Sequence, residues 1–407
     1  MWRLGFFFHE MGFGLLSIFL PLYVVTIDPA NGLFYFGVMA ATALFVAIPA
    51  SFLWGYLCDK TRRYKRYILL SFLSSTIIIY FFALVNDVPL LIVLYALLSV
   101  LHVAHEPPKN VLIAELYSRE EWEKAFAFYE GFTEIGLLIG LLLGFFMSVY
   151  ALNATSTLLL CSILNLVALV CSIVLVTDPV MIFERGLVSI EKTIDFAYSG
   201  IVIASKMMDG ITPKEGLRKE NPKAFGIGLI LFSLASSILF TPLPIFIAEE
   251  VARPVATSSA SSLVFAIYVL SACGGTAGYF LAGTRLRQMG KANVSKIVLF
   301  RSLLAFLMIG IAQMALYKVV FVTAILMSLG FAYALFLVYM LSISMEIVPK
   351  GKAGLFNALI GIGGACGSFI GPFIAQTSGF TYVFFMSGVV FFLSFICFRV
   401  FRKDKSC

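Results

Sequence analysis

The residues with the most varied chemistry lie within eight positions, in the stretch LHVAHEPPKN. His102, His105, Glu106 and Lys109 are spaced at i, i+3, i+4 and i+7, which places them on one face of a helix. An imidazole titrates near neutral pH and is also a ligand for transition metals. These four side chains could therefore carry protons, form ion pairs or bind a metal ion.

Two prolines follow directly, at positions 107 and 108. Neither has a backbone N–H, so the carbonyl groups near Val103 and Ala104 lose their helical partners. We expect the helix to bend here. A bent helix with a polar face suits the wall of a cavity.

Other ionisable residues lie in equally apolar surroundings. Glu10 follows His9, and neighbouring residues on a helix cannot both point the same way. Glu130 and Glu134 are separated by one helical turn. The second half of the chain has few charges within its apolar segments, and Arg301 is the clear exception.

The elements that position these residues belong in a membrane. The chain has 407 residues, of which 61% are hydrophobic and only 13% charged, whereas a soluble domain is about a quarter charged. Its seven cysteines have no spacing typical of disulfide frameworks or zinc sites. Basic residues exceed acidic ones, 29 to 22, but no nucleic-acid-binding motif accompanies them. No nucleophile–base pair is visible, so we expect neither an enzyme nor a cofactor.

Twelve apolar segments are long enough to cross a bilayer, which takes roughly 20 residues. The sequence therefore predicts an all-α polytopic membrane protein. The predicted spans are residues 4–26, 32–57, 67–85, 88–112, 124–150, 154–177, 224–248, 255–283, 297–317, 319–346, 353–376 and 379–398.

Cations give the orientation, because cytoplasmic loops are enriched in Lys and Arg. The stretch GYLCDKTRRYKRY holds Lys60, Arg62, Arg63, Lys65 and Arg66 between two spans without charge. The other basic loops fall on the same side, whereas the opposite side has only Arg253 and Lys318. We therefore expect both termini in the cytoplasm.

The sequence also contains an internal repeat of its first half in its second half. A polar stretch separates six spans from six, so we expect bundles at 1–177 and 224–407 with a linker at 178–223. A shift of 223 positions aligns PLYV with PIFI and GYLCDKTRR with GYFLAGTRL, and a small slip aligns Gly136, Gly140 and Gly144 with Gly363, Gly367 and Gly371. Two parallel six-helix repeats are an architecture of secondary transporters.

The linker contains a predicted amphipathic helix. Its apolar residues recur at alternating spacings of four and three, with charged residues off that stripe. The apolar positions are Ile190, Ile194, Ala197, Ile201, Ala204 and Met208. We expect this helix to lie along the membrane surface or under the bundles.

On these motifs the whole chain resembles the major facilitator superfamily. The family signature between spans 2 and 3 is met by Gly55, Asp59, Lys60 and Arg63. Arg62 stands where the family prefers Gly, and Tyr64 where it prefers a cation. The end of span 4 is similar as well, with Pro107 followed eight residues later by Glu115. The Arg of drug–proton antiporters is absent from span 4.

The resemblance implies a cytoplasmic gate made of Gly55, Asp59, Arg63 and Glu115. Gly55 would let a neighbouring helix approach closely. Asp59 would face the positive N-terminal end of span 11. Arg63 would pair with Glu115.

Three hypotheses remain open for the ionisable residues inside the spans, where charges are costly and mark function. An internal ion-pair network could join Glu106 to Lys109 and Glu130. Proton coupling could use a desolvated carboxylate or a histidine, with Glu10, Glu106 and Glu134 as the leading candidates. A metal ion could bind His102, His105 and a carboxylate.

The predicted function is secondary active transport of a small organic solute across the cytoplasmic membrane. Two bundles would rock around a central cavity, with protons as the energy source and a monomer in the lipid bilayer as the working unit. The high Phe content favours an amphipathic or aromatic solute. The alternatives are a drug or lipid efflux carrier, a metal-ion transporter, and a polytopic receptor that transports nothing.

Overall fold

The computed structural model describes residues 1–117, 122–178, 222–254, 260–285, 293–314, 317–347 and 354–401. The predicted linker helix lies outside these residues. The first half of the described chain consists of helices α1 Leu4–Ile27, α2 Gly32–Thr61, α3 Tyr64–Phe82, α4 Val88–His102, η1 Val103–His105, α5 Glu106–Leu116, α6 Trp122–Val149 and α7 Ala154–Leu175. The second half consists of α10 Pro222–Phe240, α11 Leu243–Phe246, η3 Ile247–Ala252, α12 Ala260–Arg285, α13 Asn293–Ala312, α14 Lys318–Ile347, α15 Gly354–Ser378 and α16 Phe380–Phe401.

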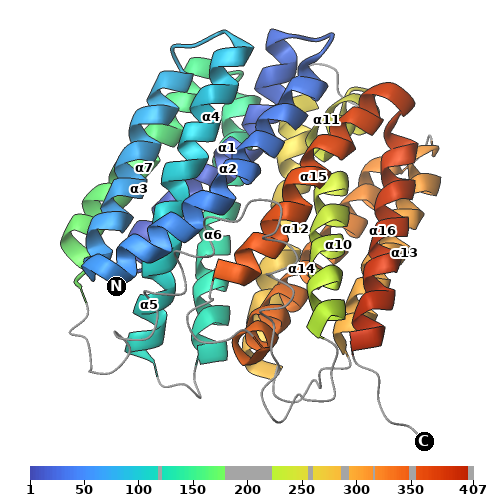
Figure 1. The fold of residues 1–407 in the computed structure, drawn as a ribbon. Coiled ribbons are helices and arrows are strands. Elements are labelled where there is room, and N and C mark those ends of the chain that lie inside the picture. Colours follow the sequence, from blue (N-terminus) through green and yellow to red (C-terminus); the bar gives the residue numbers. More distant parts are fainter. Residues whose placement is uncertain are drawn as a thin grey trace, which may run out of the picture.

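Long apolar helices dominate the fold, and the described residues contain 12 helical spans long and apolar enough to cross a membrane. The helices run up and down between two ends of the molecule (Figure 1). Many large apolar side chains, such as Val174 and Phe45, are exposed on the outside, as expected for a surface that faces lipid. The predicted twelve-helix membrane fold is confirmed.

The fourth span breaks where the prolines predicted a bend. A turn of 3₁₀ helix, η1, separates α4 from α5, which has Pro107 and Pro108 in its first turn. The N–H of Glu106 bonds to the carbonyl of Val103 in this turn. The carbonyl of His102 also accepts a hydrogen bond from Ser71 Oγ at 2.8 Å, which connects the turn to α3. The predicted bend is confirmed.

Glycines set the closest helix contacts and relate the two halves. Gly136 and Gly140 of α6 lie against the backbone of α1 at Phe7 and Met11. In the second half, the corresponding surface of α15 lies against the backbone of α10, through Gly363, Gly367 and Gly371. Close backbone approach at small residues is how membrane helices associate. Gly144, the third residue of the first ladder, instead contacts Phe265 of α12.

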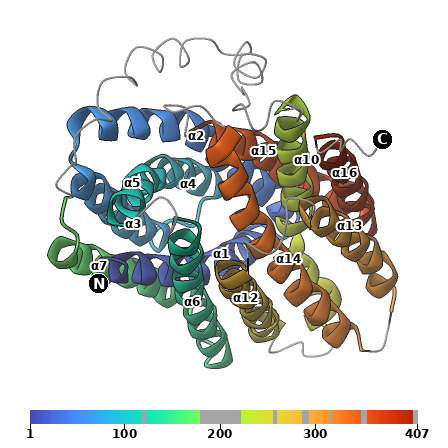
Figure 2. The same ribbon diagram turned by 90° about the horizontal axis from the view of Figure 1, so that it is seen from below.

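Two long helix pairs join the halves, α2 with α15 and α6 with α12 (Figure 2). The first pair is close at Gly37 with Pro372 and remains close at Ile48 with Gly361. Farther along α2, no described atom lies within 4 Å of the position that a Cβ on Gly55 would take. The helices α2 and α15 are therefore close toward the upper end of Figure 1 and diverge toward the lower end, whereas α6 still contacts α12 at Gly131 and Phe280.

The α2–α3 turn shows why the family prefers glycine where this chain has Arg62. Arg62 has a φ of 54°, in the left-handed region that costs an L-residue free energy and suits glycine. The family's preference for Gly at this position matches that backbone geometry.

Candidate functional site

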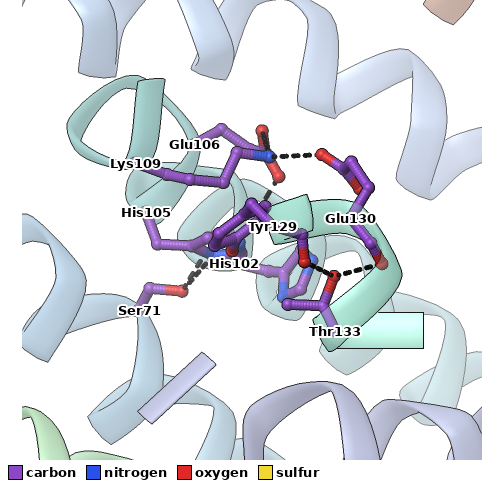
Figure 3. A network of polar contacts seen from close by, with 8 residues as sticks. All are labelled: Ser71, His102, His105, Glu106, Lys109, Tyr129, Glu130 and Thr133. Atoms are coloured by element: carbon purple, nitrogen blue, oxygen red, sulfur yellow. Dashed lines mark hydrogen bonds and ion pairs between the residues drawn. The ribbon is translucent and has the colours of Figure 1, made fainter. Parts of the chain in front are cut away.

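Polar side chains of α3, α4, η1, α5 and α6 form a network of contacts in the first bundle (Figure 3). Lys109 lies at its centre, with Nζ 2.6 Å from Glu106 Oε2 and 3.7 Å from Glu130 Oε1. The lysine side chain is only 10% exposed, against 33% for Glu106. Its ammonium therefore offsets two carboxylates in an environment where unpaired charges are costly. The predicted network of Glu106, Lys109 and Glu130 is thus formed.

Glu10 belongs to the same electrostatic group. Its carboxylate interacts electrostatically with Glu130, Glu106 and Lys109. Its neighbour His9 has no exposed surface and is buried inside the bundle. The two residues diverge as the sequence predicted. With three acids around one lysine, the group has an excess of negative charge whenever all its members are ionised.

Glu134, one turn farther along α6, occupies a different position. Its Oε1 is 2.9 Å from the point where a Cβ on Gly275 of α12 would lie, so it reaches the opposite bundle at the interface. Gly275 leaves room for this carboxylate because it has no side chain. Among the described residues no cation forms an ion pair with Glu134.

His105 does not share an exposed polar face with Glu106, as the sequence predicted it would. His105 is 1% exposed and packs against α3, with Nδ1 3.1 Å from Ser71 Oγ. The 3₁₀ turn changes the residue period from 3.6 to 3.0, so side chains before and after it no longer share one stripe. His105 therefore points into the bundle, whereas Glu106 remains half-buried at its edge.

Histidine 9 completes a cluster that the sequence did not predict. One ring nitrogen of each of His9, His102 and His105 can be chosen so that all lie within 4.8 Å of one another. His9 Nε2 is 3.1 Å from His102 Nδ1, and His9 Nδ1 is 2.6 Å from Asn165 Oδ1. Asn165 on α7 had no signal in the sequence, since a single Asn in an apolar span is common.

The structure describes only some of the side chains of the predicted cytoplasmic gate. Asp59 and Arg63 are exposed at the lower end, and the side chain of Glu115 lies outside the described part of the chain. Gly55 was expected to pack closely against another helix. No described atom lies within 4 Å of the position of its Cβ, so this contact stays a prediction.

Arg301 is a fully buried charge in the second bundle. It has no exposed surface, and within the described part of the chain none of its three guanidinium nitrogens has a hydrogen-bond partner. Four aromatic rings surround it instead, with centroids 4.8–5.5 Å from Cζ. They belong to Phe232, Phe240, Tyr333 and Phe391. Cation–π attraction then offsets part of the desolvation cost of the cation.

We expect Arg301→Met to raise the free energy of unfolding by about 1 kcal/mol relative to the wild-type protein. A flexible apolar side chain replaces a buried charge that has no counter-ion among the described residues. Thermal unfolding in detergent measures this. A clear loss of stability would mean that the four rings stabilise the cation by more than its desolvation costs.

Comparison with known proteins agrees with this architecture. The Major Facilitator Superfamily profile matches residues 4–360. The chain belongs to the major facilitator superfamily. Among curated proteins no sequence match is found.

Solved transporter structures share the fold. The nucleoside transporter NupG is 13% identical, with a TM-score of 0.69 over 99% of this chain and 98% of that one. A bacterial homologue of the human lysosomal transporter Spinster, in an inward-facing and unoccupied conformation, is 14% identical. Its TM-score is 0.66 over 100% of this chain and 97% of that one. At these identities the likeness concerns the fold, and the chain is a secondary transporter by family.

Proposed function

We propose that this protein moves a small organic solute across the cytoplasmic membrane, as a monomer, and couples that movement to protons. The observation that carries the coupling is Glu134, an acid within a membrane span that faces the opposite bundle without a cation in the described residues. Ionisable groups inside membrane spans mark ion or substrate pathways.

A carboxylate at a moving interface can link protonation to rocking of the bundles. When Glu134 is ionised, packing it against Gly275 removes its water without supplying a partner. Protonation removes that charge and lets the two helices pack closely. Proton binding at Glu134 would thus favour one arrangement of the bundles over the other.

The proposed orientation in the membrane rests on the basic turn. Arg63, Lys65 and the other cations of the α2–α3 turn support a cytoplasmic location for the lower end of Figure 1. The conformation described here would then be closed to the outside and parted along α2 toward the cytoplasm. Gly55, Asp59, Arg63 and Glu115 would form their gate contacts when that end closes.

The solute class is supported by the lining of the bundle interface. Tyr279, Phe280 and Tyr333 belong to α12 and α14, and the two tyrosines lie in electrostatic range of Glu130 and Glu134. Aromatic rings beside acids suit an amphipathic or aromatic solute with hydrogen-bonding groups. Export of drugs or lipids remains the alternative within transport.

Transport of a metal ion is less well supported. A transported solute must reach a site that opens alternately to both faces, between the bundles. All three histidines instead belong to the first bundle, and His9 and His105 are buried within it.

We expect Glu134→Gln to lose solute accumulation driven by a pH gradient by about tenfold or more, while exchange of labelled for unlabelled solute continues. The test uses proteoliposomes and a panel of labelled organic solutes, first selected by thermal shift. Nucleosides belong in the panel because one fold relative is a nucleoside transporter.

Glu249→Gln is the matched control, because Glu249 is exposed at the upper end of the fold, and it should accumulate solute normally. Normal accumulation by Glu134→Gln would refute the assignment of this residue. Accumulation by the wild type that ignored the pH gradient would refute proton coupling altogether.

A further inference from the structure

The protein contains only three histidines in 407 residues, and all three meet at one place. They come from α1, from the last residue of α4 and from η1, and positions 9 and 102 are 93 residues apart in the chain. We infer that His9, His102 and His105 form a binding site for a divalent transition metal of the zinc class, which fastens α1 to the break in the fourth span.

The hydrogen bonds around His9 fix the state of its ring. Asn165 Nδ2 donates to the carbonyl of Cys161 at 2.8 Å, so Oδ1 is the atom that faces the histidine. Oδ1 can only accept, so His9 Nδ1 carries the proton and Nε2 has a free lone pair. A metal-binding histidine shows this arrangement, in which the second ring nitrogen donates to an oxygen that orients the ring.

The lone pair of His9 Nε2 points at His102 Nδ1, 3.1 Å away. Without a metal, a proton on His102 Nδ1 fills this gap. A metal ion can replace that proton if the proton moves to Nε2 of the same ring. The exchange leaves both histidines neutral, as metal binding requires.

The third histidine is also oriented by oxygens. His105 Nδ1 lies 2.6 Å from the carbonyl of His102, and its Nε2 is 3.4 Å from Glu106 Oε1. A carboxylate beside the cluster supplies negative charge for a divalent cation, and Glu106 could provide a fourth ligand. The half-buried Glu106 also gives a route from the bundle edge to the histidines.

The spacing requires a small adjustment. Nitrogens around a tetrahedral ion with bonds of about 2.0–2.1 Å lie roughly 3.4 Å apart. The closest pair is already at 3.1 Å, whereas the widest is within 4.8 Å. A rotation of the His105 ring would bring the third nitrogen within bonding distance of the ion. The ring centroids of Phe72 and Phe13 lie 4.3 Å from that of His9 and 4.4 Å from that of His102, respectively, and these apolar rings exclude water from the site.

Because the chain has no other histidine, a spectrum of imidazole ligation from the full-length protein reports on this site. The protein must carry an affinity tag free of histidine. Titration calorimetry with Zn²⁺ should give one ion per chain, and Co²⁺ should give the visible absorption of a tetrahedral nitrogen site. His9→Gln, His102→Gln and His105→Gln should each weaken zinc binding by more than Asn165→Ala does, for which we expect about 10–100-fold.

Ser162→Ala is the control, since Ser162 is buried on the same helix as Asn165 but bonds to Thr76. It should bind zinc as the wild type does. Three outcomes would overturn the inference: no cobalt spectrum in the wild type, a thiolate spectrum that assigns the ion to cysteines, or unchanged zinc affinity in any folded Gln variant. Size-exclusion chromatography identifies variants that fail to fold. The zinc affinity of the variants that do fold then tests the inference. None of these measurements depends on transport.

Discussion

Lys109→Met should lower the free energy of unfolding by about 3 kcal/mol, near the lower end of the cost of breaking a buried ion pair, because it leaves two half-buried carboxylates without their cation. Glu106 loses a partner at 2.6 Å and Glu130 a partner at 3.7 Å. Methionine keeps most of the length of the lysine side chain, so packing changes little. Thermal or denaturant unfolding in detergent, followed by tryptophan fluorescence, measures the loss.

Two further variants separate charge from packing. Glu106→Gln added to Lys109→Met removes the closest unpaired carboxylate and should restore a large part of the stability. Lys318→Met is the control, because Lys318 pairs at 3.8 Å with Glu250, which is 54% exposed, and such surface pairs contribute about 0–1 kcal/mol. Equal losses in Lys109→Met and Lys318→Met would show that the buried network contributes no more than a surface pair.

Gly140→Ala should destabilise the first bundle by about 1–3 kcal/mol, because the added methyl group would overlap the carbonyl oxygen of Met11. The contact is with backbone, which cannot rotate away as a side chain can. The helices α1 and α6 must therefore separate along their whole contact. Unfolding in detergent measures the loss, and Gly363→Ala should behave alike through Ile230 of α10.

Gly310→Ala supplies the control, since no described atom lies within 4 Å of its added Cβ. Alanine favours helix over glycine by about 1 kcal/mol, so this variant should be at least as stable as the wild type. If Gly140→Ala were also neutral, the close contact of α1 with α6 would not be required for the fold.

The sequence by itself determined the features that depend on nearby residues. The length of each apolar run determines twelve spans, because a helix that satisfies its own backbone is the structure an apolar segment adopts in lipid. Pro107 and Pro108 determine a break in the fourth span, since neither can donate the bond that continues the helix. The contact of Glu106 with Lys109 follows from a spacing of three residues.

Only the tertiary structure decided which distant residues meet. His9 lies beside Asn165 and His102, 156 and 93 residues away, and the packing of α1 against α7 brings it to Asn165. The direction of His105 also depended on the 3₁₀ turn, after which this side chain is buried in the bundle. Arg301 was visible in the sequence as an isolated charge, but its cage of rings comes from three other helices. Apolar helices resemble one another in sequence, so their pairing and rotation are set by packing of complementary surfaces, which no local pattern contains.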